Sequence, residues 1–267
     1  MEEIDYAVET LGMRVVALSG YVARPLPGAG DLRAARWIDS FGPDDPMAYD
    51  AVWSHCRARG IVPTFHSSAM GWGSRVSQSS CVSNHIGNFA TAGEATCRSL
   101  FLAGVPQRFP ELRFAFLEGG VGWGANLYSD LVGHYEKRGG GSVDQFNPDH
   151  IDRQRMQDLF GRYGSPAFVN NLDKLDGALR TLSDPDEDAS ARDEFRHCGA
   201  DGAEGIRRVF ADQFFFGCEA DDPMNALAFN TGLNPMGARL RALFSSDIGH
   251  WDVPDMTKVM VEAYEMV

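Results

Sequence analysis

The sequence lacks long apolar runs and has few basic residues. No stretch reaches the about 18 consecutive apolar residues of a membrane-spanning helix, so we expect no membrane association. Lys and Arg total 24 against 37 Asp and Glu, which gives a formal net charge of −13. An acidic chain repels phosphate backbones, so we expect no nucleic-acid partner. The acidic start, Met1-Glu-Glu-Ile-Asp5, is the opposite of a cationic signal peptide.

Cysteine is also scarce, and its pattern excludes a disulfide framework. The five cysteines are odd in number and scattered, and none forms a C-x-x-C pair. This usage is typical of small core residues in a reducing compartment, so we expect a cytoplasmic protein. Apolar residues make up 44% and charged residues 23% of the chain, as in ordinary globular proteins. A length of 267 residues suits one α/β barrel or two small domains.

Five short apolar runs predict the strands of a parallel sheet. They are nearly continuous rather than alternating, which is typical of strands buried on both faces. Each run ends in a polar residue, and the runs are residues 14–19, 61–66, 113–118, 213–219 and 241–247. Helical patterns lie between them, at residues 45–59, 91–103, 123–138 and 254–267, with proline near two starts and glycine after three ends. This alternation predicts βαβ units and an α/β fold.

One region, residues 139–205, interrupts the alternation of strand and helix. It contains no strand pattern, and residues 149–182 look helical in parts with a break at 161–166. Residues 183–204 are acidic but lack the spacing of a calcium-binding loop, which favours a solvated loop. We therefore predict a single domain over residues 1–267 with an insertion at about 139–205.

Polar residues at the predicted strand ends are the candidates for chemistry, because active sites of parallel α/β folds lie at the carboxyl ends of the strands. These ends carry Ser19, His66, Glu118, Glu219 and Asp247. One imidazole and three carboxylates suit a divalent metal, although a polar strand end can also simply meet solvent. We predict His66 and Asp247 as metal ligands, with Asp247 also accepting a proton from bound water. Glu118 is predicted as a third ligand or an acid/base.

Three further residues are candidates for substrate binding. His250, three residues after Asp247, orients a ligand or substrate, or caps the next helix. His85 and Trp72 lie in the long segment after His66, where barrels place substrate contacts, although a surface histidine and a packing tryptophan are the plainer interpretations. The glycines at 119–124 do not match G-x-G-x-x-G, so a nucleotide-binding domain is a weaker alternative.

Four stretches, residues 64–68, 84–87, 108–120 and 246–250, resemble the amidohydrolase-related metal enzymes. This group includes aminocarboxymuconate-semialdehyde decarboxylase and related decarboxylases, hydratases and hydrolases. The resemblance implies a (β/α)8 barrel with one divalent metal, most often zinc. Family ligands come from an H-x-H pair on the first strand, a histidine on the fifth and an aspartate on the eighth. His66 matches that histidine and Asp247 that aspartate, while Glu118 stands where the sixth strand normally ends in a catalytic histidine.

Two departures from the family pattern shape the prediction. No two of the seven histidines lie two residues apart, so H-x-H is absent, and only five strands are visible, matching the fourth to eighth. We therefore expect a partial (β/α)8 TIM barrel, incomplete at its N-terminus and inactive alone. The resemblance implies a zinc-dependent hydrolase or non-oxidative decarboxylase for a small organic acid, ester or amide. The alternative is a catalytically inactive partial barrel that serves as a binding or interaction module. The sequence leaves a homo-oligomer open.

Overall fold

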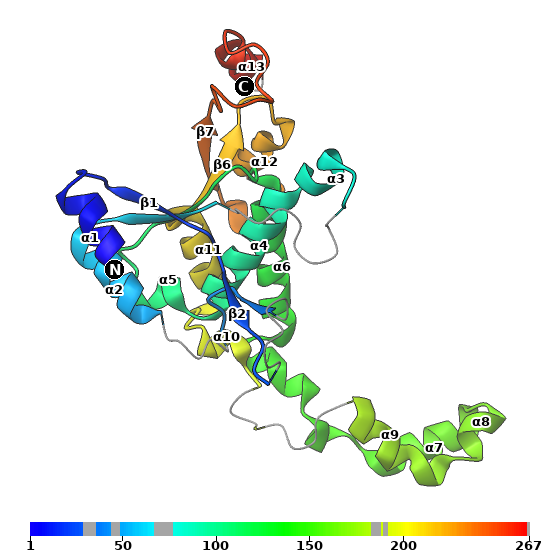
Figure 1. The fold of residues 1–267 in the computed structure, drawn as a ribbon. Coiled ribbons are helices and arrows are strands. Elements are labelled where there is room, and N and C mark those ends of the chain that lie inside the picture. Colours follow the sequence, from blue (N-terminus) through cyan, green and yellow to red (C-terminus); the bar gives the residue numbers. More distant parts are fainter. Residues whose placement is uncertain (29–35, 44–48, 67–76, 183–187, 189–191, 266–267) are drawn as a thin grey trace.

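The computed structural model describes residues 1–28, 36–43, 49–66, 77–182, 188 and 192–265 (Figure 1). Its centre is a five-stranded sheet in which neighbouring strands are parallel and follow one another in the order β1-β4-β5-β6-β7. These strands are β1 (Val15–Leu18), β4 (Val62–Phe65), β5 (Phe114–Phe116), β6 (Phe214–Glu219) and β7 (Arg241–Ser245). The α/β class and all five predicted strands are confirmed.

Helices connect the strands of this sheet. The longer ones are α2 (Asp50–Arg59), α4 (Asn88–Leu102), α6 (Gly122–Arg138), α11 (Gly202–Asp212) and, at the C-terminal side, α13 (Val259–Glu265). Shorter connecting segments are α3 (Cys81–His85), α5 (Val105–Arg108), η6 (Pro223–Asn225), α12 (Ala226–Phe229) and η7 (Pro235–Gly237). The predicted helices at 91–103 and 123–138 are thus confirmed, and the start predicted at Asp45 lies outside the described residues.

The start predicted for the last helix is wrong. Residues 254 and 255 are not helical, residues 256–258 form a turn, and α13 begins only at Val259. The physical reason is local, because the Asp255 carboxylate accepts hydrogen bonds from the Thr257 amide at 3.1 Å and from its hydroxyl at 2.6 Å. An aspartate that bonds the backbone two residues ahead stabilises a turn in place of a helix.

Three elements near the N-terminus, one helix and two strands, have no counterpart in the sequence prediction. Helix α1 (Glu2–Glu9) packs beside α2, where Asp5 accepts from His55 Nε2 at 2.8 Å. Strands β2 (Val22–Pro25) and β3 (Arg36–Asp39) form a separate antiparallel pair. The pair is held by Asp39, whose buried carboxylate accepts from Arg24 Nε at 2.6 Å and from the Tyr49 hydroxyl at 2.8 Å. Burial raises the pKa of Asp39, but these hydrogen bonds outweigh it and leave the pKa lowered.

The hydrophobic core lies on one face of the sheet. Paired residues of a parallel sheet share a face, and the register places Phe65 beside Phe116, and Phe116 beside Phe216. Aromatic rings from three helices pack on this face. Trp53 of α2 lies 5.8 Å from Phe114, measured between ring centroids. Trp123 of α6 lies 5.1 Å from Phe216, and Phe210 of α11 lies 5.2 Å from Phe214. Helices that follow different strands therefore cover the same side of the sheet.

The edge strands are less buried than predicted. Burial on both faces is confirmed for β5, whose three residues are all buried. It is wrong for β1 and β7, in which every residue is half-buried or exposed, with Val15 53% and Phe244 58% exposed. Both strands have a neighbour on only one side in the described sheet. The apolar runs therefore predict that a segment belongs to the sheet, but they do not predict how deeply it is buried.

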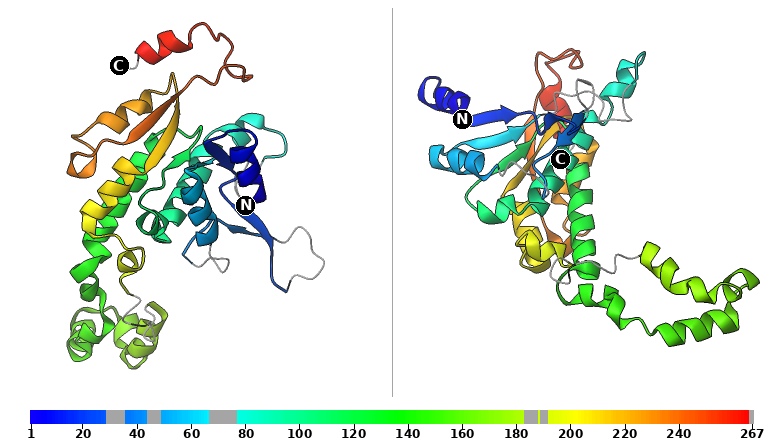
Figure 2. Two further views of the ribbon diagram at one scale, coloured as in Figure 1. Left: turned by 90° about the vertical axis from the view of Figure 1, so that its left-hand side faces the viewer. Right: turned by 60° about the horizontal axis from the view of Figure 1, so that its bottom comes forward.

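The predicted insertion contains helices and, within its described residues, no strand. It holds η2 (Gly140–Phe146), η3 (Pro148–His150), α7 (Arg153–Tyr163), α8 (Pro166–Val169), η4 (Leu172–Lys174), α9 (Leu175–Leu182) and α10 (Glu194–His197). The predicted break at 161–166 is confirmed by the end of α7 and the proline start of α8. Residues 151–182, called the arm below, stand out from the rest of the molecule in all three views (Figures 1 and 2).

Candidate functional site

Two predicted residues meet at the carboxyl ends of β4 and β5. The β1–β4 ladder continues one residue beyond β4, because the His66 amide donates to the Leu18 carbonyl at 3.1 Å. The β4–β5 ladder continues similarly through the Leu117 amide, which donates to Phe65 at 2.9 Å. This register sets His66 Nε2 in hydrogen-bonding contact with Glu118 Oε2, in an ion pair when the imidazole is protonated. The Glu118 side chain is 16% exposed and that of His66 is 40% exposed.

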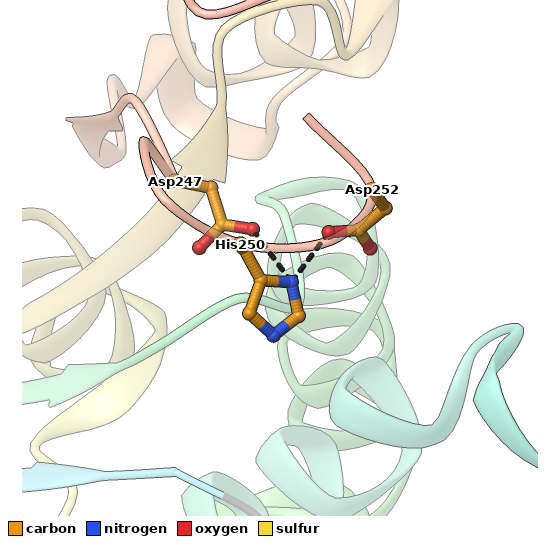
Figure 3. Close-up of side chains that lie close together, drawn as sticks. All are labelled: Asp247, His250 and Asp252. Carbon is orange, nitrogen blue, oxygen red and sulfur yellow. Dashed lines mark hydrogen bonds and ion pairs between the residues drawn. The ribbon is translucent and has the colours of Figure 1, made fainter. Parts of the chain in front are cut away.

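A second cluster follows the end of β7 (Figure 3). The His250 imidazole lies between two carboxylates, with its Nδ1 at 3.1 Å from Asp247 Oδ2 and in hydrogen-bonding contact with Asp252 Oδ1. The loop that carries all three residues turns sharply, since the His250 amide donates back to the Asp247 carbonyl at 3.1 Å. Asp247 is half-buried, while His250 and Asp252 are exposed.

The backbone is unusual at both predicted catalytic carboxylates. Glu118 has φ of +64° and Asp247 has φ of +46°, a left-handed conformation that favours glycine. Among the described residues, the other non-glycine positions with positive φ are Phe41 and Met236. Conformations of this kind cost about 1–3 kcal/mol and gather at functional sites. The backbone at both carboxylates is therefore strained, and glycine at either position would relieve this strain.

The residues predicted for substrate binding are placed differently. His85 Nε2 lies 4.0 Å from Asp252 Oδ2, and its ring packs edge-on against Phe89 and Trp251, both at 5.6 Å between centroids. His66 also packs against Phe89, at 5.1 Å, so one phenylalanine ring joins the two histidines. His250 belongs to the cluster itself. Trp72 lies outside the described residues.

The site is dominated by negative charge. Partial desolvation raises the pKa of Glu219, and repulsion from four more carboxylates, those of Asp221, Asp247, Asp252 and Glu118, raises it further. The hydrogen bond from His250 to Asp252 raises the pKa of the imidazole, and Asp247 and Glu118 add to this effect. Desolvation raises the pKa of Asp252, but the hydrogen bond from His250 outweighs it and leaves this pKa lowered. Carboxylates from the ends of three strands therefore act on one another here.

A cavity of about 400 Å³ opens between the ends of β6 and β7 and helix α13. It reaches Asp247 and Asp252 and lies next to the His250 cluster. Its described ionisable lining is six carboxylates and the amine of Lys258, which pairs with Asp255 at 3.4 Å. The carboxylates belong to Glu219, Asp221, Asp247, Asp252, Asp255 and Glu262. A cavity with this lining attracts cations and repels anions.

The cluster could hold a divalent metal ion. One nitrogen of His250 and one oxygen each of Asp247 and Asp252 all lie within 4.8 Å of one another, and among the described residues this is the one such group. Ligands bonded at about 2.1 Å lie about 3–4 Å apart around a common ion, so small movements suffice to bind one. Three protein ligands and one open position are the pattern of catalytic zinc sites. His66 is not a member of this group.

Two features of the site were not predicted from the sequence. Asp252 was missed because it lies seven residues beyond β7, although its spacing of two from His250 was visible. The second feature is the carboxylate of Asp222, which lies against the glycine turn that follows Glu118. A Cβ at Gly120 would lie 2.6 Å from Asp222 Oδ2, so this position leaves no room for a side chain. A carboxylate at this turn is unfavourable for a nucleotide phosphate.

Comparison with known proteins adds no relative to this description. A scan against models of protein families finds no match, and a search of curated proteins finds none either. Within the described residues, no helix combines the length and apolar character needed to cross a bilayer.

Proposed function

We propose that this chain carries the metal-binding half of a (β/α)-barrel hydrolase of the amidohydrolase type. Two features of the sheet support the barrel. Its strands are parallel in chain order, and helices that follow different strands pack on a single face, whereas a doubly wound sheet is covered on both faces. In this proposal the five strands correspond to strands four to eight of the barrel, and the insertion follows the helix after β5.

The observation that carries the proposed function is the Asp247–His250–Asp252 cluster at the carboxyl end of β7. In the proposal these three residues hold one divalent ion, with zinc favoured by the mixed nitrogen and oxygen donors. Asp247 keeps the ligand role expected from the sequence. The ion would lower the pKa of a bound water and offset the repulsion among the surrounding carboxylates.

His66 and Glu118 supply proton transfer in this scheme. Their hydrogen bond fixes the imidazole, and the positive φ of Glu118 holds its carboxylate at the same end of the sheet. Either group can take a proton from an attacking water and return it to a leaving group, because imidazoles and carboxylates both serve as general acids and bases. In this proposal His66 moves protons and does not hold the metal, and zinc binding by variants distinguishes this role from that of a ligand.

The charge of the cavity favours hydrolysis of an ester or amide over decarboxylation. A carboxylic acid substrate would enter as an anion among six carboxylates, with Lys258 the single basic group of the described lining. A neutral or cationic ester or amide meets no such repulsion. The ring of Trp251, 71% exposed beside His85 and His250, offers an apolar contact next to the cluster.

Metal binding tests the ligand assignment without requiring a substrate. Zinc titrated calorimetrically into the chelator-treated chain should bind at one site, and His250→Ala should weaken binding by about 10–100-fold. His66→Ala, the matched control, should bind zinc as the unchanged chain does. A loss of binding in His66→Ala with retention in His250→Ala would overturn this assignment and restore His66 as the ligand.

Turnover tests the reaction. A panel of neutral and cationic aryl esters and anilides should be hydrolysed by the zinc-loaded chain once it is extended at its N-terminus to a whole barrel, while aromatic carboxylic acids should release no carbon dioxide. Glu118→Gln should bind zinc normally and lower turnover by at least about 100-fold, because the residue moves protons and does not hold the ion. Zinc binding with carbon dioxide release and no hydrolysis would reverse the proposed reaction.

A further inference from the structure

Asp252 turns its two carboxylate oxygens toward two different histidines. Its Oδ1 is in hydrogen-bonding contact with Nδ1 of His250, inside the cluster that Figure 3 shows. Its Oδ2 lies 4.0 Å from Nε2 of His85, the last residue of α3. A hydrogen bond between nitrogen and oxygen is about 2.9 Å long, so a shift of about 1 Å completes this contact. His85 therefore approaches the carboxylate from outside the cluster.

The ring of His85 is held by aromatic rings from two other segments. Phe89 of α4 and Trp251 of the loop after β7 each pack edge-on against it, at 5.6 Å between centroids. Beyond these two, Phe89 lies 5.1 Å from His66 and Trp251 lies 6.1 Å from His250. Five rings thus form one continuous row from the end of β4 to the loop that carries the cluster. Edge-on ring pairs of this kind are favourable, so the row keeps the His85 imidazole beside that loop.

The backbone that carries His85 is fixed by hydrogen bonds of its own. The N-cap of α3 is Ser80, whose hydroxyl accepts from the Ser83 amide at 3.1 Å. The Asn84 side chain accepts from the Ser77 amide at 2.6 Å and donates to the Ser77 carbonyl at 2.9 Å. These two bonds tie the end of α3 to residue 77. The imidazole therefore projects from an anchored segment.

His85 is placed to support a ligand and not to be one. The donor atoms that lie within 4.8 Å of one another belong to Asp247, His250 and Asp252, and His85 is not a member of that group. A carboxylate that ligates a metal ion is commonly held by a hydrogen bond to its other oxygen, which fixes its orientation. The contact between Nε2 of His85 and Oδ2 of Asp252 has this arrangement, because it leaves Oδ1 beside the His250 imidazole.

We propose that His85 is a positioning residue for Asp252 and orients this carboxylate toward the ion that the cluster would hold. The inference rests on the proposed function, since Asp252 is a ligand only if the cluster binds a metal ion. The role differs from the substrate contact predicted for His85 from the sequence. His85 donates its Nε2–H to Oδ2, and the row of rings keeps the donor in place.

Two variants of His85 separate the donor from the ring, with zinc titrated calorimetrically into each chelator-treated chain. His85→Phe keeps a ring between Phe89 and Trp251 but removes the donor, and it should weaken zinc binding by at least about 10-fold. His85→Gln removes the ring but places an amide N–H near the position of Nε2, so its affinity should lie within about 3-fold of that of the unchanged chain.

His55→Phe is the matched control for the loss of an imidazole that faces an aspartate. His55 on α2 contacts Asp5 of α1 through Nε2 at 2.8 Å, and neither residue belongs to the cluster. This variant should bind zinc as the unchanged chain does. Far-ultraviolet circular dichroism accompanies each titration. A His85→Phe chain that loses the helical signal would count against the inference, because His85 would then support the fold and not one ligand.

The remaining outcomes distinguish this inference from the proposed function. Normal zinc binding by His85→Phe would show that the donor is not needed. Weak binding by both His85 variants would also overturn the positioning role, because glutamine does not replace a histidine that ligates zinc itself. In both cases the cluster would still bind zinc through His250. Zinc that fails to bind the unchanged chain, or that binds His250→Ala equally well, would overturn the metal site and this inference with it.

Discussion

Two glycines of helix α6 should respond to alanine in opposite directions. Gly124 faces the sheet, and a Cβ built there would lie 2.8 Å from Cδ1 and Cζ of the Phe216 ring. Gly133 lies on the same helix, and a Cβ built there would meet nothing within 4 Å. Both substitutions gain the same intrinsic helix propensity, so the difference between them isolates packing.

The magnitudes follow from the surroundings of each glycine. Gly133→Ala should stabilise the protein by about 0.5–1 kcal/mol, the ordinary advantage of alanine over glycine inside a helix. At Gly124 the same gain is opposed by overpacking of about 1–3 kcal/mol, since the Phe216 ring is fixed between Trp123 at 5.1 Å and Phe116 at 6.1 Å. Gly124→Ala should therefore lower the free energy of unfolding by about 1 kcal/mol.

Urea unfolding followed by circular dichroism measures both variants. With an unchanged denaturant slope, the midpoint should rise for Gly133→Ala and fall for Gly124→Ala. Shifts of the same sign would refute the close approach of α6 to the sheet at this glycine, and with it the register that brings Phe216 under the helix.

Three further predictions concern single residues. Asp39→Asn should lower the free energy of unfolding by about 2 kcal/mol at neutral pH, because it breaks a buried ion pair with Arg24. Since the pKa of Asp39 is lowered in the folded state, the difference in stability between the variant and the unchanged chain should shrink in acid-unfolding curves as pH falls through that pKa. Tyr128→Phe should cost about 1 kcal/mol at neutral pH through the hydrogen bond to the Pro235 carbonyl. Burial raises the pKa of Tyr128 to about 12, so the unfolded chain ionises first above pH 10.0 and stability should fall there, and the phenylalanine variant should lack this alkaline loss. Glu118→Gly should raise the free energy of unfolding by about 1 kcal/mol, measured by urea, while turnover is lost, because glycine relaxes the left-handed backbone.

The parallel sheet was predictable because its strands are strongly apolar and short. Phe114–Phe116 is buried on both sides, and a short apolar run between two helical patterns is typical of a central parallel strand. The hairpin of β2 and β3 was not predictable. Val22–Pro25 contains arginine and ends in proline, and its pairing depends on Asp39, fourteen positions after Pro25, meeting Arg24. Such a strand is specified by a contact distant in the sequence and not by its own pattern.

For the site, sequence position predicted the edge of the sheet but not which residues pair there. The rule that strand ends meet at one edge assigned His66, Glu118 and Asp247 to the carboxyl ends of β4, β5 and β7, and of these three the structure brings His66 and Glu118 into contact. The pairing of His66 with Glu118 depends on the ladder register beyond β4, and the pairing of His250 with Asp252 depends on a turn whose shape is not encoded by residue type. The choice between His66 and His250 as ligand of the proposed metal is therefore a question of loop geometry.

The insertion also bears on how the sheet closes during folding. About twice as many residues separate β5 from β6 as separate β4 from β5. The entropy of closing a flexible loop grows only with the logarithm of its length, and each doubling costs about 0.6 kcal/mol. Pairing Phe116 with Phe216 across the insertion is thus scarcely less favourable than pairing Phe65 with Phe116. A segment as long as the arm between two neighbouring strands therefore lowers the stability of the sheet only slightly. Its main effect is on the rate at which β6 pairs with β5 during folding.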